Sequence, residues 1–420
     1  MASTFLQPNA IDIKNITLSD LSGGNKKDIF GQVVSFNIYE DILFPVVRAD
    51  FLINDSIDLI NTFPIVGAET IEVAFVSSGY EETVKYKLHV KSVNEQRSNI
   101  SGRSKTYMIT ATSEEFITNN TVVVNKKYSQ SSADIIKSIA KDFLKTKKKI
   151  NIGDIPKGTQ EVLISRLNPL QSIDMIRRRS VSEKYLSSTY VFFENQRGFN
   201  FTSLEFLMDN LKKKVNGRIY YHDTAPNTDL KNMHSRNLLD FKHVSLFNNT
   251  KRLSQGSLNN VVKKFDLMTG EVTTIDYKNS EKQSKFKFAS EKAFPLNSTS
   301  YEKKYGSEPS KIMIIPYSSH LPETYIPESI GAKFSFATKI SENIFHAAVY
   351  GDSDLAAGDV IEIRLDTQSG FTDEQKQNRL VSGNYLISKL RHSVLMLSGG
   401  YEREYTCSME LIKGSYEDKV

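Results

Sequence analysis

The sequence has no tryptophan and only one cysteine, Cys407, in its 420 residues. A single cysteine excludes an intrachain disulfide, and the composition gives no sign of folding in an oxidising compartment. No apolar run approaches the roughly 18 to 20 residues that a membrane-spanning helix needs. The first ten residues also lack the cationic flank and apolar stretch of a secretory signal. We therefore expect neither a disulfide-stapled module nor stable membrane insertion.

A strong excess of one charge is also missing. The chain carries 54 basic and 49 acidic residues, a net charge of +5 that does not by itself indicate a nucleic-acid binder. What it does have is a globular composition, 39% hydrophobic and 25% charged, with 24 Phe and 19 Tyr to build cores or interfaces. A chain of this length predicts about three compact units.

Signatures of catalysis are missing as well. None of the seven histidines pairs with another at helical metal-site spacing, and we find neither a nucleophile elbow nor a phosphate-binding loop. Cys407 lies in a predicted strand, where a buried small side chain is the simpler interpretation than a nucleophile. The pairs Glu81-Glu82 and Glu114-Glu115 could serve glycoside hydrolysis, although neighbouring carboxylates are usually just solvated. We predict no catalytic residue, no metal and no cofactor.

Three basic runs lie at or near predicted helix C-termini, where cations interact favourably with the helix dipole. Binding of an acidic partner protein, or of DNA in transit, stays open as the alternative. The runs are residues 145–149, 177–179 and 212–214.

The first quarter of the chain is typical of an all-β sandwich or barrel, because short strands alternate with turn-forming Gly, Ser and Asn. A short helix is one interpretation of residues 57–63. The predicted strands are residues 33–39, 46–53, 71–75, 86–90 and 107–111.

The pattern then becomes mixed. Residues 133–144 form an apolar helical stripe that Ser131 and Ser132 can cap, and Asn168-Pro169 is a typical start for a helix reaching the arginine run. Residues 190–193 and 198–201 predict a hairpin, and Thr202 with Glu205 matches a capping box.

Strands return at 261–265 and 271–277, around a turn at 268–270, and again from 333–336 to about Ile412. Between them, residues 278–329 are polar and irregular. The fold class that follows is mainly β with an α/β middle domain. The predicted domains are a first tube-like β-barrel (1–115), an α/β middle domain (116–235), a discontinuous second tube-like β-barrel (236–280 and 331–420) and an inserted polar subdomain (281–330).

A faint internal repeat links the two predicted barrels. Four segments match in the same order in both, which favours a duplicated domain over two unrelated β domains with similar strand patterns. The matches are 48–56 with 345–353, 67–75 with 357–365, 86–93 with 385–394, and 107–111 with 405–409.

The clearest difference between the copies is the loop at 366–379, which replaces a short turn at 77–84. A loop this polar belongs on the surface or at an interface rim. We predict that it contacts a partner through Asp366, Asp373, Glu374, Lys376 and Arg379.

Residues 355–363 and 380–392 resemble the C-terminal barrel of the baseplate central hub proteins of T-even-like contractile-tailed bacteriophages. Related folds occur in the hub part of type VI secretion spike proteins. The Asn168-Pro169 helix and the 192–201 hairpin are similar to the family's middle domain. The resemblance covers nearly the whole chain in order, but residues 281–330 match nothing in the family.

This resemblance implies a homotrimer whose paired barrels form a pseudo-six-fold ring, with the hexameric tail tube on one side and the trimeric spike on the other. It also implies contacts with other baseplate proteins, DNA only in transit through the channel, a place in the virion tail, and synthesis in the host bacterial cytoplasm. Because the sequence ends shortly after the last predicted strand, we expect the spike to be a separate protein.

Two other functions stay open at this point. One is a tail-associated cell-wall hydrolase, which turnover of peptidoglycan would reveal. The other is the hub of a contractile injection or secretion machine that is not a phage, which neighbouring genes would reveal.

Overall fold

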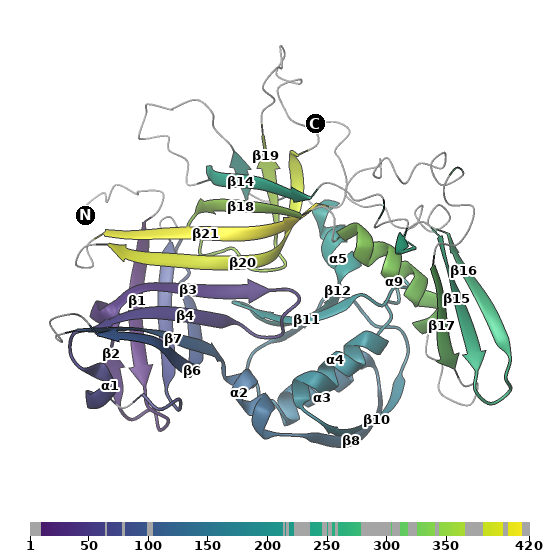
Figure 1. Ribbon diagram of the computed structural model, residues 1–420, viewed down its shortest axis with the longest axis horizontal. Helices are drawn as coiled ribbons and strands as arrows, with labels where there is room; N and C mark the ends of the chain where they lie inside the picture. The colour runs from purple at the N-terminus through teal and green to yellow at the C-terminus, as the bar shows by residue number, and fades with distance from the viewer. Residues whose placement is uncertain are drawn as a thin grey trace, which may run out of the picture.

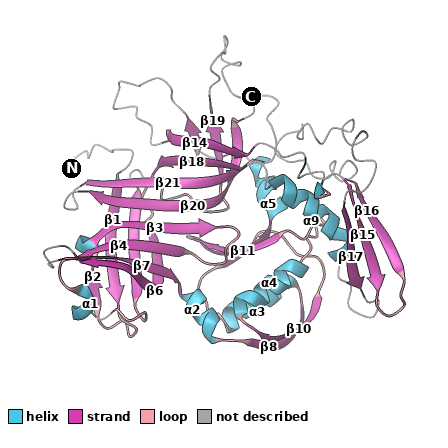
Figure 2. Cartoon of the chain, in the orientation of Figure 1, coloured by secondary structure: helices cyan, strands magenta, loops and turns pink. Residues whose placement is uncertain are grey.

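The computed structural model is mainly β, and one large, mostly antiparallel sheet runs through both ends of the chain (Figures 1 and 2). This fold class was predicted from the sequence. Within the described part of the chain, no helix is both long and apolar enough to cross a membrane. The structure describes residues 10–63, 65–77, 80–98, 104–212, 215, 218–221, 236–245, 250, 254–256, 259–278, 304, 311–317, 326–340, 344–365, 381–397 and 402–413.

The first β unit comprises β1 to β7. In β4, every second side chain is buried, and Ala49, Phe51 and Ile53 are fully buried. All five strands predicted here are confirmed, and the ambiguous segment contains a short helix. Its elements are β1 (Ile11–Ser19), β2 (Lys26–Asp28), η1 (Phe30–Gln32), β3 (Val33–Asp41), β4 (Arg48–Asp55), α1 (Leu59–Thr62), β5 (Thr70–Ser77), β6 (Val84–Ser98) and β7 (Lys105–Ser113).

The α/β middle unit has a hydrophobic core of its own. Ser131 caps α3, and Asn168 with Gln171 forms a capping box on α4. The predicted box at Thr202 is wrong by one residue, because the hydroxyl of Ser203 accepts the helix amide and Glu205 is buried. The elements are α2 (Glu114–Thr121), β8 (Val124–Gln130), α3 (Ser132–Asp142), β9 (Ile150–Ile152), β10 (Gln160–Leu167), α4 (Pro169–Arg179), β11 (Tyr190–Asn195), β12 (Gly198–Ser203), α5 (Leu204–Asp209) and η2 (Asn210–Lys212).

The second β unit continues the large sheet. Its strands are β13 (Ile219–Tyr221), β14 (Leu238–Ser245), β18 (Ile344–Tyr350), β19 (Val360–Arg364), β20 (Gly383–Leu397) and β21 (Glu402–Ile412).

Two predictions for this region are wrong. Residues 261–277 do not belong to the second barrel, because β15 (Asn259–Asp266) pairs with β16 (Val272–Lys278) and β17 (Lys311–Tyr317) in a separate sheet. The predicted strand at 333–336 lies in α9 (Ile326–Ile340). There, the buried residues Ser329, Ala332 and Phe336 recur at helical spacing, which the two alternating phenylalanines obscured. We call β15, β16, β17 and α9 the insertion sheet.

The two β units have the same strand order. The first reads β3-β4-β7-β6-β5-β1 and the second β14-β18-β21-β20-β19-β13, and corresponding strands also come in the same order along the chain. Neighbouring strands are antiparallel in both, except that β1 pairs antiparallel with β5 whereas β13 pairs parallel with β19. The four segments matched in the sequence lie on corresponding strands.

Irregularities in the strand pairing also correspond. A register shift between Val33 and Ser35 in β3 has its counterpart between Leu238 and Asp240 in β14. A second shift, between Val90 and Ser92 in β6, has its counterpart between Ile387 and Lys389 in β20. Before this point β6 pairs with β5, and after it β6 continues along β7. In the same way, β20 pairs with β19 before this point and with β3 after it. The extra residue therefore lies where the sheet turns.

These registers correct the residue-by-residue match made from the sequence. The pairing aligns Ile53 with Val349, and Tyr107 with Cys407. The sequence match of 48–56 with 345–353 is therefore off by one residue, which would set the buried Phe51 against the half-buried Ala348.

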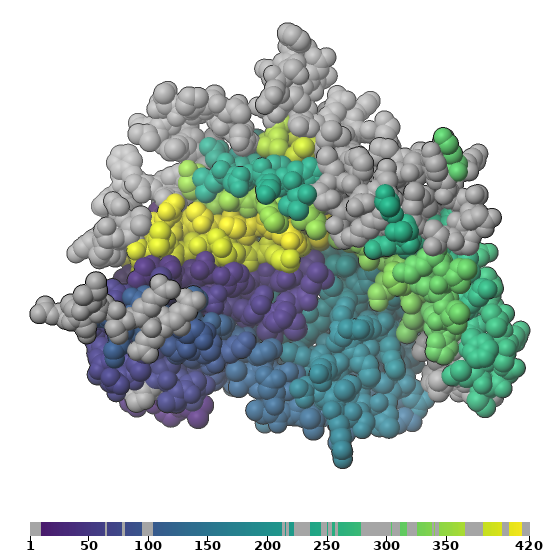
Figure 3. Space-filling view, in the orientation of Figure 1, coloured from purple at the N-terminus to yellow at the C-terminus, as the bar shows by residue number. Residues whose placement is uncertain are grey.

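The two β units are joined by direct pairing of β20 with β3, from Lys389 opposite Asp41 to Leu395 opposite Ser35. In the space-filling view, the band of β20 and β21 lies directly against that of β3 and β4 (Figure 3). Their cores also meet, since the Phe75 and Tyr405 rings lie 5.7 Å apart across the join. We call this pairing the seam.

The glycine that follows β18 tests this packing. A Cβ on Gly351 would lie 1.9 Å from Cδ1 of the fully buried Tyr405. We expect Gly351→Ala to cost about 1–3 kcal/mol or more of unfolding free energy, because the buried ring must shift. Urea unfolding measures this loss. Gly31→Ala is the control, since nothing lies within 4 Å of its Cβ position. Equal midpoints for the two variants would contradict the packing described.

Candidate functional site

The hairpin of β11 and β12 carries a tip that lies between the two β units. On one side, Glu194 accepts hydrogen bonds from the Val47 amide (3.0 Å) and the Ser113 hydroxyl (2.5 Å) of the first β unit. On the other, Asn195 Nδ2 donates to the Ala357 carbonyl (3.0 Å) and Gln196 Nε2 to the Leu355 carbonyl (3.1 Å). The tip therefore ties three parts of the chain together, and we call this place the junction.

A buried carboxylate lies at the centre of the junction. Glu40, at the end of β3, is 1% exposed and accepts from the Ala357 amide (2.8 Å), the Gln196 amide (2.5 Å) and the Tyr86 hydroxyl (3.0 Å). Burial raises the pKa of Glu40 to about 7, although the three hydrogen bonds oppose the shift.

Two arginines close the junction on its second-unit side. Arg197 and Arg218 both bind the Asp359 carboxylate, at 2.6 and 2.8 Å, and Arg218 also binds Asp354 at 2.6 Å. Asp359 in turn accepts from the Ala356 amide. These charges are largely paired within the chain, which favours a positioning role.

An ion triad of a partly buried lysine and two buried carboxylates lies on the opposite side. Lys148 Nζ is 2.7 Å from Glu115 and 2.6 Å from Glu194, and both carboxylates are almost fully buried. Burial opposes the charge of Lys148, but the two carboxylates outweigh it and raise its pKa. Glu115 was expected to be solvated, and that expectation was wrong, because its side chain is buried.

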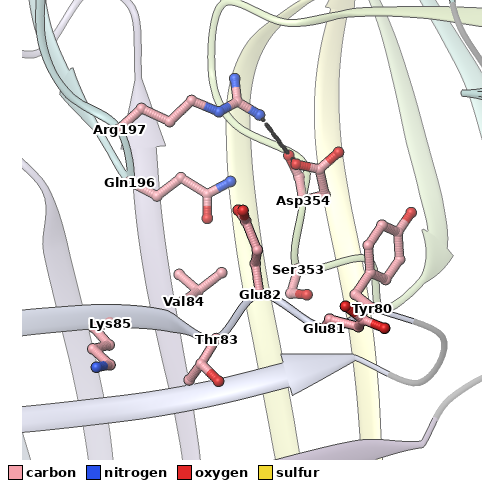
Figure 4. Close-up of a pocket in the computed structure, with 10 residues that line it drawn as sticks. All are labelled: Tyr80, Glu81, Glu82, Thr83, Val84, Lys85, Gln196, Arg197, Ser353 and Asp354. Atoms are coloured by element: carbon pink, nitrogen blue, oxygen red, sulfur yellow. Dashed lines mark hydrogen bonds and ion pairs between the residues drawn. The ribbon is translucent and has the colours of Figure 1, made fainter.

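An open cleft of about 570 Å³ lies beside the junction (Figure 4). The turn between β5 and β6 forms one wall, and Gln196, Arg197, Ser353 and Asp354 form the others. A glycosidase needs a carboxyl shielded from water as its general acid. Glu81 and Glu82 are both exposed, and Asp354 is bound to Arg197 and Arg218. The cleft therefore offers no arrangement that favours hydrolysis.

Cys407 has a histidine beside it, which the sequence analysis missed. His392 Nδ1 lies 3.4 Å from the Cys407 Sγ and 2.7 Å from the Tyr405 hydroxyl, and all three residues are fully buried. Burial raises the pKa of Cys407 to about 12 and lowers that of His392 to about 4. Both groups are therefore neutral at pH 7 and closed to substrate, unlike an activated thiolate. The prediction of a buried Cys407 is confirmed.

The architecture of this chain is similar to that of solved tail-protein structures. A tail protein from Neisseria meningitidis MC58 matches with a TM-score of 0.57 at 12% identity, covering 96% of each chain. The 43 kDa tail protein of prophage MuSo2 from Shewanella oneidensis matches with a TM-score of 0.55 at 10% identity, covering 96% of this chain and 99% of that one. The chain has a tail-protein fold.

A component of the E. coli type VI secretion system, the c3393 protein, matches with a TM-score of 0.46 at 9% identity over 98% of this chain and 79% of its own. No family model and no curated protein matches the sequence.

Among the predicted basic runs, Lys148 reaches the junction through Glu115 and Glu194. Arg177, Arg178 and Arg179 occupy the last turn of α4, as predicted. Within the described residues, no group of three or more His, Cys, Asp or Glu side chains could hold a metal ion. The predicted contact loop at 366–379 and the lysines at 213 and 214 lie outside the described residues.

The raised pKa of Glu40 makes the free energy of unfolding depend on pH in a known direction. Its folded-state pKa, about 7, exceeds the ordinary 4.5. The stabilisation is therefore complete below about pH 4.5 and is lost as the pH rises through about 7. Between pH 5 and 8, we expect the wild type to lose roughly 3 kcal/mol of unfolding free energy relative to Glu40→Gln. Urea unfolding at each pH measures the difference. Glu81→Gln, which removes an exposed carboxylate, should keep the wild-type slope, and parallel curves for wild type and Glu40→Gln would rule out the shifted pKa.

Lys148 provides a second test. Lys148→Met leaves Glu115 and Glu194 buried without their cation, which should cost roughly 3 kcal/mol. The control is Lys127→Met, which breaks the exposed pair with Glu161 and should cost about 1 kcal/mol or less. Adding Glu115→Gln and Glu194→Gln to Lys148→Met should recover part of the loss. If both lysine variants unfold alike, the triad does not stabilise the junction.

Proposed function

We propose that this chain is a structural hub of a contractile phage tail baseplate, a homotrimeric ring that adapts the hexameric tail tube to the trimeric spike. The proposal extends the sequence resemblance, and the fold shared with two tail proteins supports it. Its place would be the virion tail after synthesis in the host cytoplasm, with other baseplate proteins around it and DNA passing only through its channel.

The observation that carries the proposal is the correspondence between the two β units. Six strands share one order, and the register shifts of β3 and β6 recur in β14 and β20. Alternating strands resemble one another by chance, but matched bulges do not follow from alternation. This supports a duplicated unit. Three copies of a chain with two equivalent units give six such units around one axis, and head-to-tail contacts of this kind close into rings.

The differences between the two β units fit the proposed contact with partners that are not six-fold. The insertion sheet interrupts only the second β unit, between β14 and β18. Repeated in three copies, it would leave one element on every second unit, so that the ring has three-fold rather than six-fold symmetry. We propose that the insertion sheet faces partners that are not six-fold, such as the spike or the surrounding baseplate. The loop residues Asp366, Asp373, Glu374, Lys376 and Arg379 belong to the same proposal.

We also propose that the chain has no catalytic activity of its own. Cys407 and His392 are enclosed in the core, and the cleft carboxylates are exposed or paired with arginines. Any cell-wall hydrolysis would then belong to the spike. Turnover of peptidoglycan by the purified chain, abolished by one carboxylate substitution, would overturn this part.

The mass of the particle in solution tests the ring. We expect light scattering to give three times the 47.6 kDa of one chain for the protein alone, or that mass plus the mass of the bound spike once its spike protein is added. The monomer-only control is the same protein in denaturant. A particle that stays monomeric with the spike present, and in the assembled tail, contradicts the proposal.

A further inference from the structure

We propose that the free edge of β6 in one copy pairs antiparallel with β14 of a second copy, with Asn94 opposite Ser245 and Arg97 opposite Lys242. This rests on the proposed ring. It names the interface that closes it and fixes its register. Joined in this way, three copies would form one continuous wall, to which each contributes the eight strands from β14 through β20 and β3 to β6.

The seam inside the chain provides the template. There β20 pairs antiparallel with β3, with Arg391 opposite Tyr39 and Ser393 opposite Asn37. In the correspondence between the units, β6 takes the place of β20, and β14 takes the place of β3. If every junction between units in the ring is alike, the contact between copies must therefore be β6 against β14.

Both strands have an open edge where the template needs one. Within the described residues, β14 pairs only with β18, and the part of β6 beyond Val90 pairs only with β7. The two strands lie at opposite ends of the eight-strand row, as Figure 1 shows, so they cannot meet within one copy. An unpaired edge of this length presents amides and carbonyls ready to bind another strand.

Side-chain burial also points to a missing neighbour. Phe36 and Ile38 of β3 and Leu390 of β20, which flank the internal seam, are at most 2% exposed. Their counterparts Phe241 and His243 of β14 and Val93 of β6 are all half-buried. Core-facing positions are thus closed at the seam that has both strands. They are partly open at the two edges, beside which the described residues place no further strand.

The strongest observation is a pair of matched irregularities. β14 has one additional register shift, between His243 and Ser245, that β3 lacks. β6 has one additional shift, between Asn94 and Arg97, that β20 lacks.

Placed on the template, the two extra residues fall at the same level of the new seam, one on each strand. The pairing therefore stays in step on both sides of them. An extra residue on one edge alone would displace the register by one and turn the following side chains to the wrong face. The edge of β6 therefore matches the edge of β14, because both carry the extra residue. Neither edge would match β3 or β20, which lack it.

Disulfide trapping in the full-length chain tests the register. One double variant carries Asn94→Cys and Ser245→Cys, and the other Arg97→Cys and Lys242→Cys. Facing positions in an antiparallel pair alternate between hydrogen-bonded and non-hydrogen-bonded sites, so these two pairs, three residues apart, include one of each.

The controls recombine the same four positions. Asn94→Cys with Lys242→Cys, and Arg97→Cys with Ser245→Cys, place the cysteines about 10 Å out of register. That separation is too large for a disulfide. We expect oxidation to convert at least one matched variant into covalent dimers and trimers, which a reductant should return to monomeric chains. Either control should give at least tenfold less cross-linked oligomer. The native Cys407 is present in all four and is buried.

Failure of the inference can be told apart from failure of the proposed function. A trimeric mass without cross-links in either matched variant, or with equal cross-links in the controls, overturns the β6–β14 register and leaves the ring standing. A chain that is monomeric under all conditions overturns the ring itself, and the interface with it. Circular dichroism of each variant, equal to that of the wild type, confirms that the fold is retained.

Discussion

The backbone pairing of β20 with β3 is the constraint on which the rest of the structure depends. It joins residues some 350 positions apart into one ladder, from Lys389 opposite Asp41 to Leu395 opposite Ser35. It thereby fixes the two β units at one spacing and one relative direction. The junction then depends on it, because the hairpin tip bonds to both units at once through Glu194 and Asn195. If the seam moved, these bonds could not all be kept, and buried polar groups would lose their partners.

The polar interior of the junction shows why this fixed arrangement is compatible with a passive role. Glu40 and the triad around Lys148 are costly to bury and are satisfied by partners from different parts of the chain. Catalytic sites also bury charged groups, but they leave a reacting atom accessible. Here the buried groups bind one another and the backbone, so the chemistry holds the units together. The proposed position between a tube and a spike would require this rigidity.

Much of the fold could be predicted from the sequence where the signal was local. Alternation located the strands of the first β unit, and Ser131 and Asn168 marked the helix starts. The second unit was harder, because the strand neighbours of residues 259–278 depend on pairing with β17, some 50 residues away, and no local pattern encodes that. Strand order survived in the repeat, but its residue register did not, since the two neighbouring alanines Ala347 and Ala348 do not reveal which of them faces the core. The junction could not be predicted from local patterns either, because Glu40, Gln196 and Ala357 are far apart in the sequence and meet only in the folded structure.

The most direct measurement is a cryo-EM reconstruction of the assembled tail tip, computed without imposed symmetry. The account predicts three copies of this chain in one ring, with six β units around the axis and seams that alternate between β20–β3 within a copy and β6–β14 between copies. A ring in which copies meet through the insertion sheet, or one containing six copies, would contradict it.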